Sequence, residues 1–291
     1  MHLAFLGTPE AAVPTLRALI EAGHDVDIVI TRPDRRRGRG NERSPSPVKV
    51  AAESLGLRVA HRLSDLESAS VERGIVVAYG ALIPGAVLER TPMLNVHFSL
   101  LPRWRGAAPV ERAILAGDTE TGVSVMTLEV ELDTGPVHEV RRVAVGEKTL
   151  TELLGELSFV GAEALVEVLA STSLLAHATA QSGDVVYAAK LTKEDFHLTP
   201  SVASEQLLRT VRLGRAFMFV HGRRLLVEAA GRSSEVDVDV GHVTRRGEGI
   251  LLGAAGGAVE LLRVRPEGKG SMDALAWWAG ARLDEHSTMW A

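Results

Sequence analysis

The sequence predicts an α/β protein with a mostly parallel, doubly wound sheet, followed by a small β-barrel. Three observations support this prediction. Apolar strand patterns alternate with helical patterns through the first 170 residues, which is typical of right-handed βαβ units covered on both faces. Small and polar residues interrupt the alternation at 171–184. About five short strand-like segments separated by glycine and polar turns then follow, a spacing typical of a small barrel.

The expected elements of the first part alternate in type from residue 2 onward. The expected strands are His2–Leu6, Val26–Ile30, Arg58–Ala60, Ile75–Ala78, Leu94–His97, Val123–Leu128 and Val137–Val143. The expected helices are Pro14–Ala22, Pro47–Gly56, Leu66–Glu72, Pro84–Glu89, Pro109–Leu115 and Thr149–Leu169. Prolines in the first turn and glycines at the end mark several of these helices, and Ser46 is the expected N-cap before Pro47.

The second part begins with a helix at Ser201–Leu213 and ends with one at Met272–Trp278. Between them we expect strands at Phe217–Val220, Arg224–Ala229, Val236–Thr244, Ile250–Leu252 and Val259–Val264. Trp277 and Trp278 are expected in the core, because apolar tryptophans on a short helix pack inside more often than they form a stacking surface. We therefore expect a first domain at 1–170, a linker at 171–184 and a second domain at 185–291.

Composition and missing motifs disfavour several classes of protein. The chain has 291 residues, a net charge of −5 and no cysteine, so it has no disulfide, thiolate nucleophile or cysteine-ligated metal. One glycine follows the first strand where a dinucleotide fingerprint needs three, and neither a Walker A loop nor a metal-binding histidine spacing is present. No apolar run approaches the ~20 residues of a membrane span, and the N-terminus lacks a basic signal region. We expect a soluble, cytoplasmic protein.

Positive charge is concentrated in one segment of this acidic chain. Residues 32–49 hold seven basic residues against two acidic ones. Five arginines stand within nine residues, namely Arg35, Arg36, Arg37, Arg39 and Arg43. Spacing alone slightly favours a solvated surface loop. The alternative is a clamp for phosphate groups, because each guanidinium can pair with one phosphate.

The segment Asn95–Pro109 is the densest in groups that can do chemistry. Strand alternation places Asn95 and His97 on one side of the expected strand and Val96 and Phe98 on the other. An amide can donate to a developing oxyanion and an imidazole can move a proton, a combination that suits acyl transfer. A polar strand end satisfied by loop backbone is an equally good interpretation of the spacing alone.

A carboxylate follows a later strand, at Asp133 before Thr134-Gly135. Spacing alone favours a turn former, because Asp before Thr-Gly is common in turns. The functional alternative is a carboxylate paired with His97, which would orient the imidazole and favour its charged form.

Together these segments resemble the methionyl-tRNA formyltransferase family, within the wider group of 10-formyltetrahydrofolate-dependent formyltransferases. The matching segments, in the family's order, are Phe5–Pro9, Arg32–Arg35, Gly38–Gly40, Ser44–Lys49, Val76–Gly80, Asn95–Pro109, Leu132–Gly135 and Ala189–Asp195. The resemblance covers residues 1–195 well and the rest loosely. Phe98 departs from the glycine or proline of most members, and its ring is expected to point away from Asn95 and His97.

The resemblance implies a fold, an activity and a set of site residues. It implies a Rossmann-like formyltransferase domain followed by an oligonucleotide-binding (OB-like) barrel that binds tRNA. It implies catalytic roles for Asn95, His97 and Asp133. The implied folate-binding loop is Ser99, Leu100, Leu101 and Pro102, and the implied tRNA contacts are the five arginines between Arg35 and Arg43.

The implied reaction moves a formyl group from 10-formyltetrahydrofolate, without a metal, to the α-amine of methionyl initiator tRNA. Asn95 and protonated His97 would donate to the formyl oxygen, while Asp133 would hold His97 and help take the amine's proton. We expect the chain to act as a monomer, with the arginine loop exposed and either mobile or disordered without RNA.

Two rival functions stay open at this point. One is a folate-dependent formyltransferase acting on a sugar-nucleotide or glycinamide-nucleotide amine, for which the arginine loop and second domain are oversized. The other is a tRNA-binding protein whose α/β domain does not catalyse, against which the intact set of Asn95, His97 and Asp133 argues.

Overall fold

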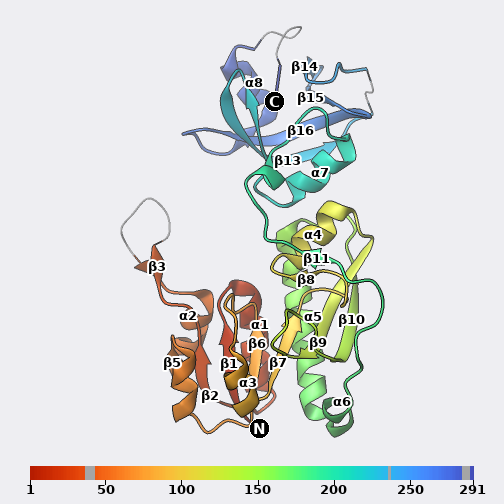
Figure 1. Cartoon of the computed structure of the whole chain (residues 1–291). Helices are drawn as coiled ribbons and strands as arrows, with labels where there is room; N and C mark the ends of the chain where they lie inside the picture. The colour runs from red at the N-terminus through yellow and green to blue at the C-terminus, as the bar shows by residue number, and fades with distance from the viewer. Residues whose placement is uncertain (37–42, 235–236, 284–288) are drawn as a thin grey trace. The chain divides into compact units, whose positions relative to one another are not determined.

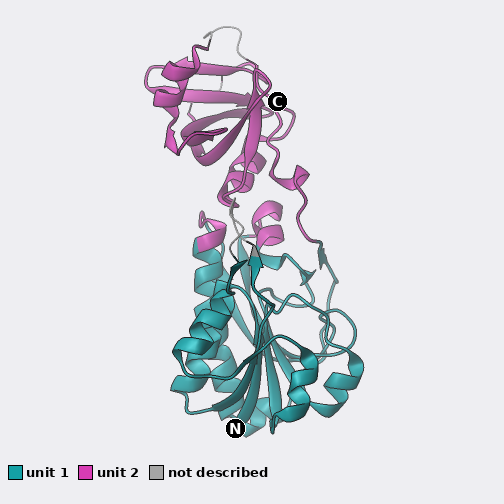
Figure 2. Ribbon diagram, turned by 90° about the vertical axis from the view of Figure 1, so that its left-hand side faces the viewer, with its two compact units in different colours: residues 1–110, 119–146, 152–189 teal, residues 111–118, 147–151, 190–291 magenta. Residues whose placement is uncertain are grey.

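The computed structural model describes residues 1–36, 43–234, 237–283 and 289–291. The chain forms two compact units (Figure 2). The first comprises residues 1–110, 119–146 and 152–189, and the second comprises residues 111–118, 147–151 and 190–291. After two short excursions the chain passes into the second unit for the rest of its length at Lys190. The expected linker at 171–184 instead belongs to the first unit and contains helix α6 (Thr172–Ala176).

The first unit is built on one seven-stranded sheet of order β10-β9-β7-β6-β1-β2-β5 (Figure 1). Its strands are β1 His2–Gly7, β2 Asp25–Ile30, β5 Val59–Ala60, β6 Arg73–Val77, β7 Met93–His97, β9 Glu120–Thr127 and β10 Val137–Ala144. The strands from β5 to β7 run parallel, whereas β9 is antiparallel to both β7 and β10. The chain winds from β1 out to β5 and then returns to the other side of β1. This is the predicted doubly wound topology, in which ligands bind beside the carboxyl ends of the strands.

Helices lie on either side of this sheet (Figure 2). They are α1 Val13–Glu21, α2 Pro47–Ser54, α3 Gly85–Arg90 and α5 Leu150–Ala170, with short 3-10 helices at Glu10–Ala12 and Leu63–Ser68. Helix α4 (Pro109–Ala116) begins at the end of the first unit and lies mostly in the second. The expected cap of α2 is present, since the Ser46 hydroxyl accepts a hydrogen bond from the Lys49 N–H at 3.0 Å. Apolar residues of the parallel strands, including Leu6, Ile30 and Val76, form a buried core.

The sequence prediction was wrong for the helix at Leu66–Glu72. A 3-10 helix runs instead over Leu63–Ser68, and Ala69 is already extended. The Ser68 hydroxyl donates to the Asp65 carbonyl at 2.8 Å. Serine side chains that bond nearby backbone offer an alternative to helical hydrogen bonds, which is why this segment does not continue as a helix.

Two short ladders were not predicted, because two-residue strands carry no periodic pattern. β3 (Arg35–Arg36) pairs antiparallel with β4 (Arg43–Ser44). β8 (Arg105–Gly106) pairs parallel with β11 (Tyr187–Ala188). The second ladder brings the end of the first unit beside the loop that follows β7.

The second unit holds an antiparallel sheet of order β12-β13-β16-β15-β14, with β17 beside β16. The strands are β12 Phe217–Val220, β13 Arg223–Arg232, β14 Val243–Arg246, β15 Gly249–Ala254, β16 Gly257–Pro266 and β17 Met272–Asp273. Residues 289–291 bridge both edges of this sheet, at Val220 on β12 and at His242 just before β14. Joining both edges closes the sheet into a barrel and removes its exposed strand edges.

The expected strand at Val236–Thr244 is shorter than predicted, because only its last two residues belong to β14. A turn precedes it, in which the His242 N–H donates to the Asp239 carbonyl at 3.0 Å and Gly241 has a φ of +87°. A residue in that conformation cannot continue an extended strand.

Helix α7 (Ser204–Arg212) and helix α8 (Ala274–Ala281) pack on this barrel. Trp277 and Trp278 are buried in its core, as expected, together with Trp290. In the described part of the chain, no helix is long and apolar enough to cross a membrane.

Candidate active site

Strand β7 separates a polar face from an apolar face. Val96 and Phe98 face helix α5, where a Cβ placed on Gly161 would lie 2.7 Å from Val96 Cγ1 and 3.6 Å from Phe98 Cε1. Alternation therefore turns the side chains of Asn95 and His97 to the opposite face. The Phe98 ring packs against α5, so the departure from the family pattern at this position does not put a ring beside His97.

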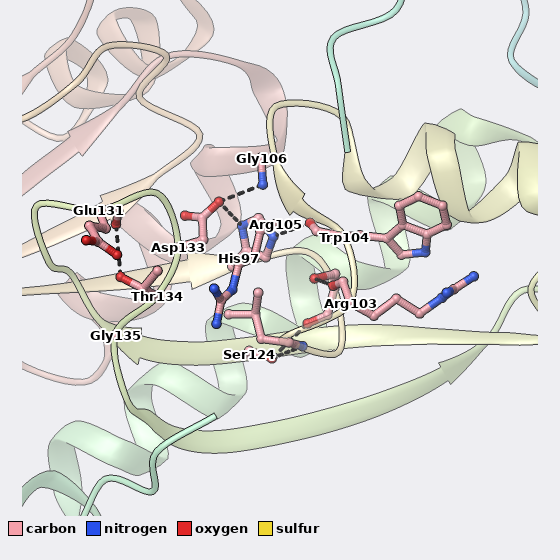
Figure 3. A network of polar contacts seen from close by, with 12 residues as sticks. His97, Arg103, Trp104, Arg105, Gly106, Ser124, Glu131, Asp133, Thr134 and Gly135 are labelled. Carbon is pink, nitrogen blue, oxygen red and sulfur yellow. Dashed lines mark hydrogen bonds and ion pairs between the residues drawn. The ribbon is translucent and has the colours of Figure 1, made fainter. Parts of the chain in front are cut away.

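The His97 imidazole is held between a carbonyl and a carboxylate (Figure 3). Its Nε2 lies 2.9 Å from the Trp104 carbonyl oxygen, and its Nδ1 lies 3.7 Å from Asp133 Oδ2. A carbonyl only accepts hydrogen bonds, so Nε2 carries a hydrogen and donates it. Nδ1 is then the nitrogen that can take up or release a proton, and the carboxylate beside it would stabilise the protonated ring.

Asp133 reaches His97 from the loop between β9 and β10. Antiparallel pairing puts Thr127, at the end of β9, opposite Leu94 near the start of β7, so the loop must run back along the sheet to reach His97. Asp133 has a φ of +51°, and its Oδ2 accepts a hydrogen bond from the Gly106 N–H at 2.8 Å. The carboxylate is therefore aimed by a backbone donor on the loop that follows β7.

The Asn95 residue is mostly buried, but its amide has no hydrogen-bond partner among the described residues. The residue is 8 % exposed, and no hydrogen bond from its side chain to the described residues is present. Its amide atoms are not among the fully buried polar atoms without a partner, so water or a ligand can reach them. This amide is thus the strongest candidate on β7 for a donor to a substrate oxygen.

The expected folate-binding loop at 99–102 is folded by its own polar groups. Ser99 is fully buried and its hydroxyl donates to the Arg103 carbonyl at 2.7 Å, while its own carbonyl accepts from Ser124 Oγ at 2.8 Å. The side chain of Ser99 therefore shapes the loop. Leu100, Leu101 and Pro102 are half-buried, with a cis peptide bond between the last two.

Exposed apolar side chains gather on two loops beside this site. Leu82 is 83 % exposed and precedes α3, and Val130 and Leu132 are 72 % and 51 % exposed in the loop that carries Asp133. The two loops touch, since a Cβ on Gly85 would lie 3.1 Å from Val130 Cγ2. The described residues include no cluster of three metal-ligating side chains.

The described part of the arginine segment begins and ends on the β3–β4 ladder. Arg35 and Arg43 are exposed there, and the Asp34 carboxylate pairs with Lys49 Nζ at 2.9 Å below it. Arg36 belongs to β3, whereas Arg37 and Arg39 lie outside the described residues. The structure thus brings Asn95, His97 and Asp133 together and places the described arginines on a separate ladder.

Several supporting residues were missed by the sequence analysis. Trp104 and Gly106 hold His97 and Asp133 through backbone atoms, which leave no side-chain signal. Ser124 sits between two valines on β9, and a polar residue inside a buried strand was a signal that could have been used. Gln181 donates from Nε2 to the carbonyls of Asp133 and Gly135, both at 2.8 Å, and lies in the expected linker.

An amide and an imidazole on β7 of a doubly wound sheet, with a carboxylate from the β9–β10 loop, are a set of side chains that suits acyl transfer. Residues 1–169 match the formyl transferase family, and residues 190–282 match the formyl transferase C-terminal domain. The chain belongs to the formyl transferase family.

Similar proteins cover almost the whole chain. It is 40 % identical over 298 residues to a methionyl-tRNA formyltransferase of Jannaschia sp. (strain CCS1), covering 97 % of this chain and 98 % of that protein. It is 42 % identical over 298 residues to the methionyl-tRNA formyltransferase of Pseudarthrobacter chlorophenolicus, covering 96 % of this chain and 97 % of that protein.

Solved structures share the fold. HypX from Aquifex aeolicus in complex with tetrahydrofolic acid superposes with a TM-score of 0.68 at 19 % identity, over 95 % of this chain, which spans 46 % of HypX. Methionyl-tRNA formyltransferase from Clostridium thermocellum superposes with a TM-score of 0.59 at 14 % identity, over 93 % of this chain and all of that one.

Proposed function

We propose that this protein transfers a formyl group from 10-formyltetrahydrofolate to the α-amino group of methionyl initiator tRNA, for translation initiation. The observation that carries the chemistry is the His97 imidazole held between Trp104 and Asp133, beside the uncommitted Asn95 amide. The choice of acceptor is supported by the methionyl-tRNA formyltransferases that are about 40 % identical over nearly the whole chain.

Each of the three side chains has one task in the proposed reaction. The bound formyl donor supplies the carbon that the amine attacks, and its amine nitrogen takes a proton as it leaves. Asn95 donates a hydrogen bond to the formyl oxygen as negative charge develops there. His97 accepts the proton of the attacking amine at Nδ1 and passes it to the leaving nitrogen, while Asp133 stabilises the imidazolium.

This proposal assigns proton transfer to His97, in place of the hydrogen bond to the formyl oxygen that the resemblance implies. Because its Nε2 hydrogen is donated to Trp104, only Nδ1 is available to reacting groups. One oxyanion donor is typically worth ~3–4 kcal/mol, and holding two substrates in register can supply more. No covalent enzyme intermediate is required.

We propose that RNA is bound through the arginine segment and through the barrel of the second unit. Arg35 and Arg43 are exposed on the β3–β4 ladder. The barrel has a groove of about 860 Å³ whose charged lining is Arg223, Arg224 and Lys269 against Glu267. Positive groups of this kind bind the phosphate backbone, so they supply affinity without base specificity.

The deciding experiment measures tetrahydrofolate released from 10-formyltetrahydrofolate with different acceptors. We expect rapid release with methionyl initiator tRNA and little without an acceptor. Faster release with an amino-sugar nucleotide or glycinamide nucleotide would favour the rival formyltransferase. No release with any acceptor would favour the tRNA-binding protein without catalysis.

We also propose that the protein acts as a monomer in the cytoplasm, where charged tRNA and folate meet. In support, Asn95, His97, Asp133 and the groups that hold them all belong to one unit of one chain. Light scattering of the protein as it elutes from a size-exclusion column is expected to give a molar mass of about 31.1 kDa, that of one chain. Twice that mass would contradict the proposal.

A further inference from the structure

Asp133 is poorly secured by its own loop. The loop leaves β9 opposite the start of β7, whereas His97 is the last residue of β7. Asp133 also holds a left-handed backbone conformation, with a φ of +51°. Aspartate adopts this region more readily than most residues, but here its carboxylate is committed to Gly106 and His97, so the backbone conformation gains from contacts elsewhere. Contacts from outside the loop would therefore help to fix the main chain at Asp133.

The Gln181 side chain supplies that fixation. Its Nε2 donates hydrogen bonds to the carbonyl oxygens of Asp133 and Gly135, both at 2.8 Å. The two carbonyls lie on either side of Thr134, so one amide group holds both ends of the turn that begins at the strained residue.

Arg105 determines which way the Gln181 amide points. The guanidinium donates from Nε and Nη2 to Gln181 Oε1, at 3.0 and 2.6 Å. A guanidinium only donates and a carbonyl only accepts, so the amide has one orientation that satisfies all its partners.

Arg105 also connects this amide to His97. It stands between Trp104, whose carbonyl accepts from His97, and Gly106, whose N–H donates to the Asp133 carboxylate. Gln181 thus joins the loop that orients His97 to the loop that carries Asp133. The 3.7 Å between His97 Nδ1 and Asp133 Oδ2 depends on both loops.

We infer that Gln181 is a positioning residue that holds the Asp133 carboxylate at His97 for proton transfer. This inference rests on the proposed function, because it assigns Gln181 no role except through Asp133.

The surrounding backbone should keep its fold without this side chain. Thr179 exchanges two backbone hydrogen bonds of 2.8 Å with Val137. The N–H groups of Arg105 and Ala107 donate to the carbonyls of Val186 and Ala188, both at 2.9 Å. These bonds hold the 179–188 segment in place whatever stands at position 181.

The test compares Gln181→Ala and Gln181→Glu with the control Gln206→Ala. Gln206 is the other glutamine of the chain and lies on α7 in the second unit. We expect both Gln181 variants to lower kcat by about 10- to 100-fold, since a misplacement of about 1 Å can cost ~10²-fold. KM for either substrate should change less than about threefold, and Gln206→Ala should match the wild type.

The Gln181→Glu variant tests whether the hydrogen bonds that Gln181 donates matter, apart from the size of its side chain. It keeps the size of the side chain and an acceptor for Arg105, but an ionised carboxylate cannot donate to the two carbonyls. Near-normal kcat for Gln181→Glu would therefore overturn the inference. If Gln181→Ala lowers the melting temperature, Gln181→Glu carries the test, because the Arg105 contact is retained.

A double-mutant cycle with Asp133→Ala separates positioning from general structural support. If Gln181 acts through Asp133, Gln181→Ala should cost less than about twofold further in kcat once Asp133 is absent. An equal loss with and without Asp133 would overturn the inference. Near-normal kcat for Asp133→Ala alone would instead overturn the proposed role of Asp133, a result that can be told apart from a failure of Gln181 alone.

Discussion

The three candidate catalytic residues differ in the hydrogen-bond partners that hold their side chains. His97 is held at Nε2 by the Trp104 carbonyl and Asp133 by the Gly106 N–H, whereas the Asn95 amide has no partner among the described residues. Groups that are held in place are pre-oriented for catalysis, and a donor without a protein partner can bond to a developing charge. Each substitution should therefore affect kcat more than KM.

Asn95→Ala is expected to lower kcat by about 10²-fold or more, because it removes the proposed oxyanion donor. Binding of tRNA, measured by filter retention, should stay within about twofold of wild type. Unchanged kcat would remove Asn95 from the mechanism.

His97→Ala and Asp133→Asn are each expected to lower kcat by ~10²-fold, the first by removing the proton carrier and the second by removing the charge that stabilises it. Steady-state formylation at saturating substrates measures both. His177→Ala, on an exposed histidine of the first unit, serves as the control and should retain full activity. A normal rate for either site variant would argue that its side chain is only structural.

At the scale of elements, helix α5 approaches the sheet closely where glycine permits it. Gly161 faces Val96 and Val123, and a Cβ there would lie 2.7 and 3.2 Å from their Cγ1 atoms. Gly155 on the same helix has open space around its Cβ position. A larger side chain would therefore clash at Gly161, whereas at Gly155 it would only favour the helical conformation.

Gly161→Ala is expected to lower the free energy of unfolding by about 1–3 kcal/mol through overpacking against β7 and β9. Gly155→Ala should raise it by about 0.5–1 kcal/mol, because alanine favours the helix and nothing obstructs it. Urea unfolding of the two variants gives the comparison. Equal effects of the same sign would contradict the close approach of α5 at Gly161.

Helix α4 carries a half-buried acid, Glu111, in its first turn. Burial raises the pKa of Glu111 above its ordinary value of 4.5. An acid whose pKa is raised by folding destabilises the folded state above that pKa, and the cost disappears below the unfolded value.

Glu111→Gln is therefore expected to raise the melting temperature by roughly a few degrees at pH 8, with the gain vanishing towards pH 4. Thermal unfolding monitored by circular dichroism across this range measures the effect. Glu163→Gln, on an exposed position of α5, is the matched control and should show no such pH dependence. A gain at pH 4 equal to that at pH 8 would show that the charge is not responsible.

At the scale of the whole molecule, an acidic chain must attract a polyanion. The net charge is −5, yet residues 32–49 hold seven basic residues against two acidic ones. Binding of tRNA then depends on local charge, and each phosphate contact releases counterions.

Replacing Arg35, Arg36, Arg37, Arg39 and Arg43 by serine is expected to raise KM for methionyl-tRNA and to flatten its dependence on salt, while folate binding stays intact. A variant without the exposed Arg17, Arg58 and Arg62, on other parts of the first unit, is the control. Unchanged kcat/KM of the five-charge variant at moderate salt would identify the segment as an ordinary surface loop.

The sequence by itself determined the fold class, most strand positions and the face of β7 that carries Asn95 and His97. These features follow from local rules: periodicity distinguishes strands from helices, and alternation assigns side chains to faces. The cap at Ser46 and the burial of Trp277 and Trp278 were predicted on the same kind of grounds.

Only the tertiary structure decided how the site is held together. Strand β9 runs antiparallel to β7, so Asp133 reaches His97 through a long loop with a positive φ, which no spacing rule predicts. The supports come from backbone atoms of Trp104 and Gly106 and from Gln181, which lies 48 residues beyond Asp133 in an expected linker. Such contacts join segments that are distant in sequence, and local patterns contain no information about which distant segments meet.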